Sequence, residues 1–425
     1  MINSLTTFHP ELKMEYREYN SAKDKKAVFR IWQESGWIDE QRGKETDKIM
    51  NAFMKSSSAY VAEVKDNAES SVLTTPGTIR YLNEDLKFCA VTGVATSRIA
   101  RNRNFATELT ALALADSAVK GTCVAGLGIF EQGFYNKLGF GNGPYEHWIS
   151  FDPSNLRVQP NRRIPFRISL KDIKKIHKSR LSRLRGHGSV NLLPFESTQL
   201  DISQIKNGFG LGFYDEKSGE LTHHTWIETE GENGPYSVHW MSYQNYDQFL
   251  ELLSLLKSLS DQVYTVKIKE PPEIQIQDLL TKPFRYTEIT RHGKHANYMF
   301  SSSYYQLRIL NLNACITKTH LPKIRLVFNL QLNDPISDYL SKHSSWKGIS
   351  GNYIIKIDNN SEIVDGKENG LPTLIASVGA FTRMWLGVRS ATSLSVTDDL
   401  SAPKELFNKL DGIFRLPAPK ADWDF

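Results

Sequence analysis

Two apolar runs with a helical pattern between them stand out in residues 88–129. Val91–Thr96 is rich in β-branched residues and predicts a buried strand. The polar segment Ser97–Asn104 follows, and apolar positions then recur at helical spacing until Gly121, a residue typical of helix C-termini. Thr122–Ile129 predicts a second buried strand. This order places a helix N-terminus, with unpaired N–H groups and the positive dipole end, at the end of a sheet, and it predicts a site for an anion such as a phosphate.

The residues before this pattern predict two helices and then a meander of strands. A strand at MEYREYN precedes Ser21 and Asp24, which we interpret as a capping box that opens a helix through Trp32. The remaining predicted elements are a helix near Asp47–Met54 and strands at Tyr60–Val64, Gly77–Asn83 and Lys87–Thr96.

The middle of the chain repeats the strand–helix–strand order. The predicted elements are a hairpin of Gly210–Tyr214 and Leu221–Ile227, a strand at Ser237–Ser242, a helix at Tyr246–Leu259 and a strand at Val263–Lys269. The turn before this helix contains Asp247 and lacks an arginine, and the aspartate would repel a diphosphate. We therefore predict a second unit of the same kind that has no cofactor of its own.

The last part of the chain has a different pattern. Ile324–Leu332 alternates strictly and predicts a half-buried strand, and Tyr353–Ile357 predicts another. An aromatic-bearing helix is expected at Val378–Leu386. This region is therefore expected to be mixed α+β.

Length and composition bound the class of protein. The 425 residues predict about three domains, and 40% hydrophobic residues support packed cores. No apolar run approaches the roughly twenty residues of a membrane span, and the N-terminal residues lack a secretory pattern. The widely spaced Cys89, Cys123 and Cys315 indicate core thiols in a reducing compartment. We expect a cytoplasmic protein without membrane association.

A basic segment and a pair of histidines are weaker candidates for binding sites. The net charge of +5 suits an anionic cofactor without requiring nucleic acid. The basic segment Lys171–Arg185 has an amphipathic period, which we interpret as a solvated helix near a domain junction, with a nucleic-acid-binding helix as the alternative. Adjacent His223 and His224 point to opposite faces of a strand, so we expect no metal site.

Two motifs resemble GNAT N-acetyltransferases. The turn Arg101–Ala106 is similar to the family's (Gln/Arg)-x-x-Gly-x-(Gly/Ala) pyrophosphate loop, with Asn104 where the family usually has glycine. Asn tolerates positive φ, so the turn can form. About thirty residues later, EQGFYNKLGF is close to the family's FYxKxGF segment, whose tyrosine, here Tyr135, protonates the departing thiolate.

The resemblance to the Eis (enhanced intracellular survival) group of this family extends over nearly the whole chain. It includes YYQLRIL at Tyr304–Leu310, MWLGVRSA and an aromatic C-terminal residue. It implies a mixed α/β (α+β) chain of tandem GNAT domains, the second degenerate, followed by a sterol-carrier-like α+β domain, with boundaries at 1–153, 154–298 and 299–425. It also implies a hexamer, and acetyl transfer to a primary amine of an aminoglycoside-, polyamine- or lysine-like acceptor.

The same resemblance assigns site residues. Tyr135 is the expected general acid, and the terminal carboxylate of Phe425 is the expected general base, with the Asp424 side chain as its competitor. The residues expected to hold acetyl-CoA are Val94, Ala95, Thr96, Arg101, Asn102, Arg103, Asn104, Phe105, Ala106, Thr107, Phe130 and Glu131.

An acceptor pocket is expected near Trp32 and Trp37, although either residue is also explained as core. The acidic residues Glu34, Asp39 and Glu40 fit such a pocket or a solvated loop equally well. A different class of function stays open, in which the chain is a non-catalytic carrier of coenzyme A or lipid on the same scaffold.

Overall fold

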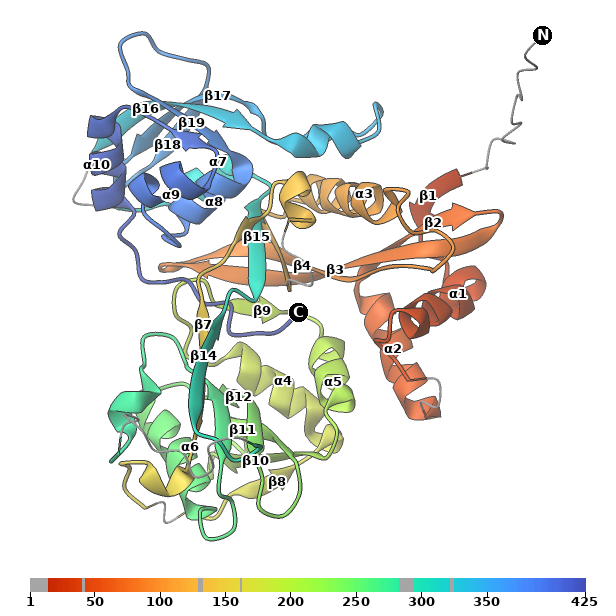
Figure 1. The fold of residues 1–425 in the computed structure, drawn as a ribbon, viewed down its shortest axis with the longest axis vertical. Helices are drawn as coiled ribbons and strands as arrows, with labels where there is room; N and C mark the ends of the chain where they lie inside the picture. Colours follow the sequence, from red (N-terminus) through yellow and green to blue (C-terminus); the bar gives the residue numbers. More distant parts are fainter. Residues whose placement is uncertain (1–13, 40–42, 129–132, 161–162, 283–292, 322–324) are drawn as a thin grey trace.

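The computed structural model describes residues 14–39, 43–128, 133–160, 163–282, 293–321 and 325–425. In this part of the chain, helices pack against three β-sheets (Figure 1), which confirms the predicted mixed α/β class. The α-helices are α1 (Ser21–Glu34), α2 (Lys44–Ser56), α3 (Phe105–Val119), α4 (Ile173–Leu181), α5 (Phe195–Gln204), α6 (Tyr246–Ser258), α7 (Leu312–Thr317), α8 (Val378–Trp385), α9 (Ala391–Thr397) and α10 (Lys404–Ile413).

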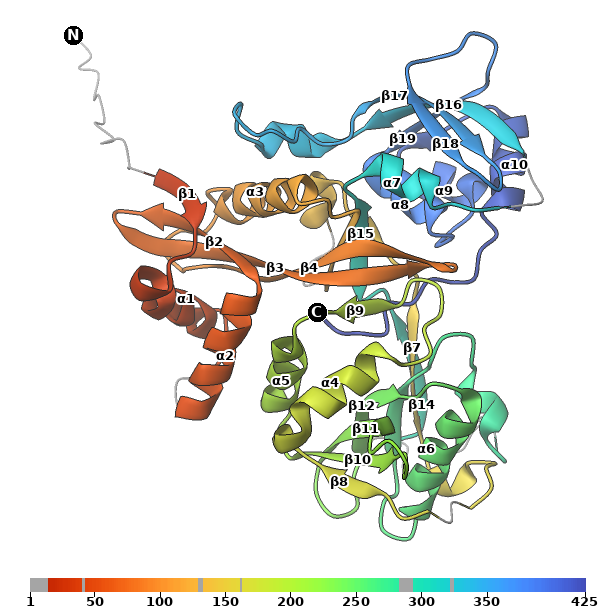
Figure 2. The ribbon, with the colours of Figure 1, turned by 180° about the vertical axis from the view of Figure 1, so that it is seen from behind.

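The first sheet has helices on both faces. Helix α3 lies on one face, and α1 and α2 lie on the other (Figures 1 and 2). Apolar side chains such as Leu109 and Leu114 fill the α3 side, and Val28 and Phe53 fill the α1 side. In sheet order the strands are β1 (Met14–Glu18), β2 (Ser58–Val64), β3 (Asn67–Tyr81), β4 (Glu84–Thr96), β5 (Val124–Gly128), β15 (Tyr305–Ile309) and β6 (Gly141–Asn142), with β9 (Val190–Leu192) paired to β3.

The second sheet supports α4, α5 and α6. Its core contains Phe213, Ile227 and Leu252. In sheet order its strands are β14 (Tyr298–Ser302), β7 (Glu146–Phe151), β13 (Val266–Lys269), β12 (Tyr236–Ser242), β11 (Leu221–Thr229), β10 (Gly208–Tyr214) and β8 (Phe166–Ile168).

The third sheet packs against α7 to α10 around Phe328, Trp385 and Leu410. The Trp385 ring also stacks on Tyr81 of the first sheet, with ring centroids 4.2 Å apart. In sheet order its strands are β18 (Glu362–Asp365), β17 (Gly351–Ile357), β16 (Leu326–Asn333), β19 (Thr373–Ser377) and β20 (Leu400–Ser401).

Some strands cross between the expected domain ranges. Strand β7, from the range 1–153, lies in the second sheet between β14 and β13. Strand β15, from the range 299–425, lies in the first sheet between β5 and β6. The three ranges remain a prediction, and the sheets are built from segments that are far apart in sequence.

The expected capping box of α1 is wrong by one residue. Asn20 is the N-cap, and its side chain accepts hydrogen bonds from the N–H groups of Ala22 and Lys23. Asp24 accepts from the Asn20 N–H at 2.7 Å and pairs with Arg17 at 2.7 Å. The carboxylate is drawn to the arginine of β1, which shifts the cap by one position.

The basic segment Lys171–Arg185 is only in part the solvated helix that its pattern predicts. Helix α4 ends at Leu181, and its lysines are exposed. The side chains of Arg180 and Arg183 point inward, and these residues are only 4% and 9% exposed. Their partners lie elsewhere in the chain, at Asp201 and Asp422. No helix in the described residues is both long and apolar enough to cross a membrane.

Candidate active site

A cavity of about 550 Å³ lies where β4 and β5 part, and we call it the β4–β5 cavity. The two strands pair in parallel from Phe88 with Val124 to Ala90 with Gly126. Beyond that pairing, the rest of β4 and the end of β5 line the cavity. Its described lining residues are Ser35, Trp37, Val91–Thr96, Ala100–Thr107, Gly128, Phe134, Tyr135, Lys137 and Phe425.

The turn before α3 provides one wall of this cavity. Asn102 and Asn104 adopt left-handed backbone conformations, with φ of +60° and +61°. Asn104 is the N-cap of α3 and makes no side-chain capping hydrogen bond. The first N–H groups of a helix have no partner within the helix, so those of Phe105 to Thr107 are available to an anion.

The charged side chains that line the cavity are all positive. Among the described lining residues, the charged side chains are those of Arg101, Arg103 and Lys137. They add to the positive end of the α3 dipole. The wall formed by the turn and α3 therefore fits a diphosphate.

Tyr135 begins the 3-10 helix η1 (Tyr135–Leu138) and lines the same cavity. Its ring packs against Phe134 and Phe140, with centroids 4.8 and 6.1 Å away. Burial raises the pKa of the Tyr135 phenol to about 12. The hydroxyl therefore stays protonated at physiological pH and can donate a proton or a hydrogen bond.

Phe425 reaches the cavity from the far end of the sequence. A main-chain oxygen of Phe425 accepts a hydrogen bond from the Gly128 N–H at 3.2 Å. The Phe425 ring packs edge-on against Phe88 with centroids 5.5 Å apart. A Cβ at residue 128 would lie 2.8 Å from that Phe425 oxygen, so the approach requires glycine.

The structure thus brings the described site residues predicted from the sequence together around one cavity. All the expected cofactor residues of β4, the turn and α3 line it, as do Tyr135 and Phe425. Phe130 and Glu131 lie outside the described residues. Asp424, the expected competitor of Phe425, instead pairs with Lys269 at 2.7 Å and lines a different cavity.

Of the two tryptophans expected either in the core or in an acceptor pocket, one is core and the other lines the cavity. Trp32 is core, and its indole N–H donates to Ser71 Oγ at 3.1 Å. Trp37 is 43% exposed and lines the cavity. Glu34 accepts from the Arg98 N–H at 2.7 Å, and Glu40 lies outside the described residues.

The sequence did not predict a site role for the lining residues Ser35, Val91, Thr92, Gly93, Ala100, Gly128, Phe134 and Lys137. Phe134 and Lys137 belong to the FYNKLGF motif, so the motif could have predicted them. No local pattern predicts Gly128, because the need for glycine at this position comes from the close approach of Phe425, at the other end of the chain.

The corresponding helix of the second sheet is closed to an anion in a way that α3 is not. The Asn245 side chain accepts from the Gln248 N–H at 3.0 Å, and the Gln248 side chain accepts from the Gln244 N–H at 2.7 Å. Asp247 lies in the first turn of α6. These side chains occupy donors that a phosphate would need.

His223 and His224 do not converge. The His223 ring contacts Glu251 at 2.9 Å, whereas His224 contacts Ser179 at 3.0 Å. Burial lowers the pKa of both rings. Within the described residues, no group of three potential ligands is placed to hold a metal ion.

Parallel strands that part beside an uncapped helix N-terminus are the arrangement that the resemblance to GNAT N-acetyltransferases implies. In agreement, residues 15–143 match the family model of the acetyltransferase (GNAT) domain. This part of the chain is a GNAT acetyltransferase domain. No curated protein matches the sequence.

Solved structures share the fold over almost the whole chain. A probable N-acyltransferase from Enterococcus faecalis is 16% identical with a TM-score of 0.78, covering 97% of this chain and 100% of its own. A GCN5-related N-acetyltransferase from Anabaena variabilis is 12% identical with a TM-score of 0.77 and the same coverage of both chains. Eis1 from Mycobacterium abscessus is 16% identical with a TM-score of 0.73, again over 97% and 100%. At these identities the likeness shows the fold alone.

Proposed function

We propose that this protein is an acetyl-CoA-dependent N-acetyltransferase that acetylates a primary amine of a small molecule or a lysine side chain. The observation that carries the proposal is the convergence of an uncapped helix N-terminus, a buried tyrosine and a main-chain oxygen of Phe425 on the β4–β5 cavity. Acyl transfer requires an anion cradle, an acid for the leaving thiolate and a base for the amine.

In this proposal the cavity wall holds the donor. Arg101, Arg103 and the N–H groups of Asn102 to Thr107 bind the diphosphate. Val94, Ala95 and Thr96 offer main-chain groups to the pantetheine arm, and an N–H of this strand polarises the thioester oxygen. Phe130 and Glu131 are assigned to the same binding site.

The reaction then forms a C–N bond and breaks a C–S bond. The neutral amine attacks the thioester carbon, and the thiolate leaves with a proton from Tyr135. The carboxylate of Phe425 orients the amine and accepts its proton, directly or through water. The carboxylate side chain of Asp424 is held by Lys269, which favours Phe425 over Asp424 for this role.

We also propose that residues 1–153 form the catalytic domain, 154–298 a degenerate GNAT-like domain and 299–425 a sterol-carrier-like domain. The assembled form would be a cytoplasmic hexamer. Light scattering coupled to size exclusion tests the assembly, since a monomer would contradict it.

The test of the function is thiol release from acetyl-CoA with a panel of polyamines, aminoglycosides and lysine peptides. The intact protein is compared with a variant lacking Phe425 and with one extended by a single alanine, which keeps the Phe425 ring and converts its carboxylate to an amide. Activity lost in both variants supports the base assignment. Activity that persists both in the extended variant and in the variant lacking Phe425 rejects the Phe425 carboxylate, and Asp424→Asn is then the variant to assay.

Absence of thiol release with every acceptor, together with no acetyl-CoA binding by calorimetry, would contradict the function and favour the carrier. Intact mass of each protein verifies its C-terminal residue.

A further inference from the structure

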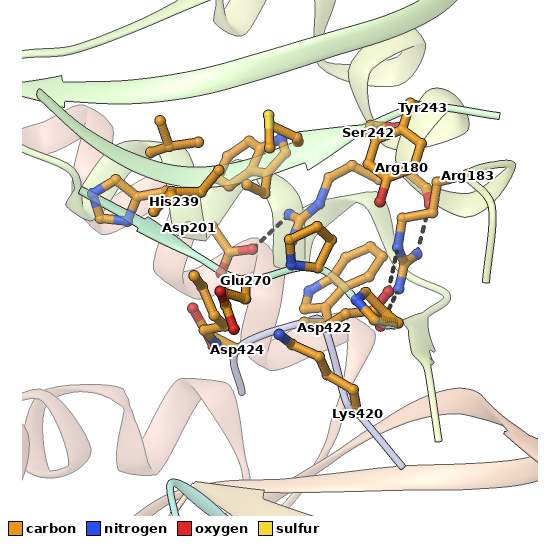
Figure 3. A pocket seen from close by; sticks show the side chains of 18 of the residues that line it. Arg180, Arg183, Asp201, His239, Ser242, Tyr243, Glu270, Lys420, Asp422 and Asp424 are labelled. Carbon is orange, nitrogen blue, oxygen red and sulfur yellow. Dashed lines mark hydrogen bonds and ion pairs between the residues drawn. The ribbon is translucent and has the colours of Figure 1, made fainter. Parts of the chain in front are cut away.

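A second cavity, of about 310 Å³, lies where β12 and β13 part in the second sheet (Figure 3). These strands pair in parallel from Tyr236 with Val266 to Val238 with Ile268, and the residues beyond that pairing line the cavity. We call it the β12–β13 cavity. It occupies the place in the second sheet that the β4–β5 cavity occupies in the first.

The last residues of the sequence enter this opening. Lys420, Asp422, Trp423 and Asp424 all line the β12–β13 cavity, whereas the next residue, Phe425, lines the β4–β5 cavity. In both views the chain end lies beside β9, between β3 and β4 of the first sheet and helices α4 and α5 (Figures 1 and 2). The C-terminal segment 419–425 therefore connects the two cavities.

Main-chain hydrogen bonds hold the start of the C-terminal segment. Tyr305 of β15 donates from its hydroxyl to the Pro419 carbonyl at 2.9 Å. The Lys420 N–H donates to the His187 carbonyl at 2.9 Å, and the Val190 N–H donates to the Ala421 carbonyl at 2.8 Å. The path of the segment is thereby set before it reaches the cavity.

Arg183 binds Asp422, and every N–H group of its guanidinium has a partner. Its Nη2 and Nε donate to the two carboxylate oxygens of Asp422, at 2.7 and 3.1 Å. The remaining guanidinium hydrogens reach the carbonyls of Arg180 and Val190 and the side chain of Asn191. A buried guanidinium with five satisfied N–H groups has a single orientation, and the bidentate pair transmits that orientation to Asp422.

Arg180 holds Trp423 by a different contact. Its guanidinium carbon lies 3.7 Å from the centroid of the Trp423 ring and 4.3 Å from that of Trp240 on β12. The charge is balanced by Asp201 at 2.7 Å. A buried cation must be paired, and here the pairing also packs the indole against the second sheet.

The last anchor comes from β13. Lys269 pairs with Asp424 at 2.7 Å and with Glu146 of β7 at 3.2 Å. Three successive residues of the C-terminal segment are thus held by Arg180 of α4, Arg183 just after α4 and Lys269 of β13, directly before the residue that enters the other cavity.

We infer that Arg180, Arg183 and Lys269 are positioning residues for Phe425, and that the second sheet serves as the receptor for the C-terminal segment in place of a cofactor. The inference rests on the proposed role of the Phe425 carboxylate. It assigns a task to a unit that has no anion cradle of its own, and it explains why arginines of the basic segment 171–185 are buried.

The test is Asp422→Asn, which keeps the shape and removes the charge that Arg183 binds. Asp422 has a φ of +48°, a conformation that asparagine tolerates, so the backbone is preserved. Asp365→Asn, on the exposed end of β18, is the matched control. Arg183→Lys is a second variant, which keeps the charge and loses the bidentate geometry.

One readout does not depend on activity. Carboxypeptidase A releases an accessible C-terminal phenylalanine, so its rate reports how firmly Phe425 is held. We expect release about tenfold faster in Asp422→Asn than in the intact protein or the control. Equal rates in all three proteins would overturn the inference.

The second readout is turnover. Asp422→Asn should lower kcat about tenfold to a hundredfold while the Kd for acetyl-CoA is unchanged, because a small displacement of a reacting group is costly. In a protein lacking Phe425, the same substitution should cause no further loss. A protein that requires Phe425 but tolerates Asp422→Asn would overturn the positioning role and leave the proposed function intact. If the intact protein shows no turnover but Asp422→Asn still releases Phe425 faster, the proposed function is rejected, and the role of Arg180, Arg183 and Lys269 in holding the C-terminal segment stands.

Discussion

Asn104 shows how one backbone angle supports the proposed anion site. Its φ of +61° aims the turn toward the N-terminus of α3, and asparagine accepts this conformation more readily than other residues with a side chain. The sequence pattern led to the same expectation, because the loop needed a residue that tolerates positive φ at this position.

Substitution of Asn104 should therefore separate conformation from side-chain chemistry. Asn104→Gly should keep the affinity for acetyl-CoA, whereas Asn104→Ala should weaken it about tenfold, since alanine pays about 1–2 kcal/mol in the left-handed region. Isothermal titration with acetyl-CoA measures both. Equal affinity of the two variants would show that the angle is not what the site needs.

Tyr135 gives a prediction about rate alone. Tyr135→Phe keeps the packing against Phe134 and Phe140 but removes the acid, so kcat should fall about 10²- to 10⁴-fold with little change in acetyl-CoA affinity. Steady-state kinetics and calorimetry test this together. A parallel loss of affinity would contradict the role as acid.

At the scale of elements, helix α4 links stability to pH through His177. The buried ring contacts Thr198 Oγ1 at 2.9 Å and the Leu193 carbonyl at 3.0 Å. Burial lowers its pKa to about 4 from the ordinary 6.5. Between these values the unfolded chain binds a proton that the folded protein does not, so stability is lost as pH falls from 6.5 toward 4.

The difference in pKa is worth up to about 3 kcal/mol of stability. His177→Gln should flatten the pH dependence of urea unfolding between pH 6.5 and 4, whereas His343→Gln, at an exposed position, should leave it unchanged. Parallel curves for intact protein and His177→Gln would refute the assignment.

The elements that local pattern could predict are those whose contacts are local. Strand β4, helix α3 and the hairpin of β10 and β11 follow from alternation, helical spacing and turn residues, and they lie where the sequence predicts them. The cap of α1 was misplaced because Arg17, on another element, attracts Asp24. The amphipathic pattern of 171–185 could not reveal that Asp201 and Asp422 draw two of its arginines inward.

At the scale of the whole molecule, a buried ion pair joins the first sheet to the residue that follows β16 of the third sheet. Arg308 of β15 pairs with Asp334 at 2.7 Å, and both side chains are fully buried. Arg308 also donates to the Leu138 carbonyl, and Asp334 accepts from the N–H groups of Ile336 and Ile349.

Asp334→Asn should destabilise the protein by about 3–5 kcal/mol, because it leaves a buried guanidinium without its counter-ion. Asp338→Asn, at an exposed position nearby, should change stability by less than about 0.5 kcal/mol. Chemical unfolding followed by circular dichroism measures both. Similar midpoints for the two variants would show that the pair does not hold the units together.

The place of β15 also sets an order for biosynthesis. Strand β6 is made by residue 142, yet the strand that separates it from β5 begins at residue 305. At roughly 5–20 residues per second, a ribosome needs about 10–30 s to cover that interval. During this time the nascent first sheet has the open edge of β5, a surface that invites pairing with other chains. The first sheet therefore cannot be completed when residues 14–142 emerge, and the edge of β5 stays open until β15 has been made.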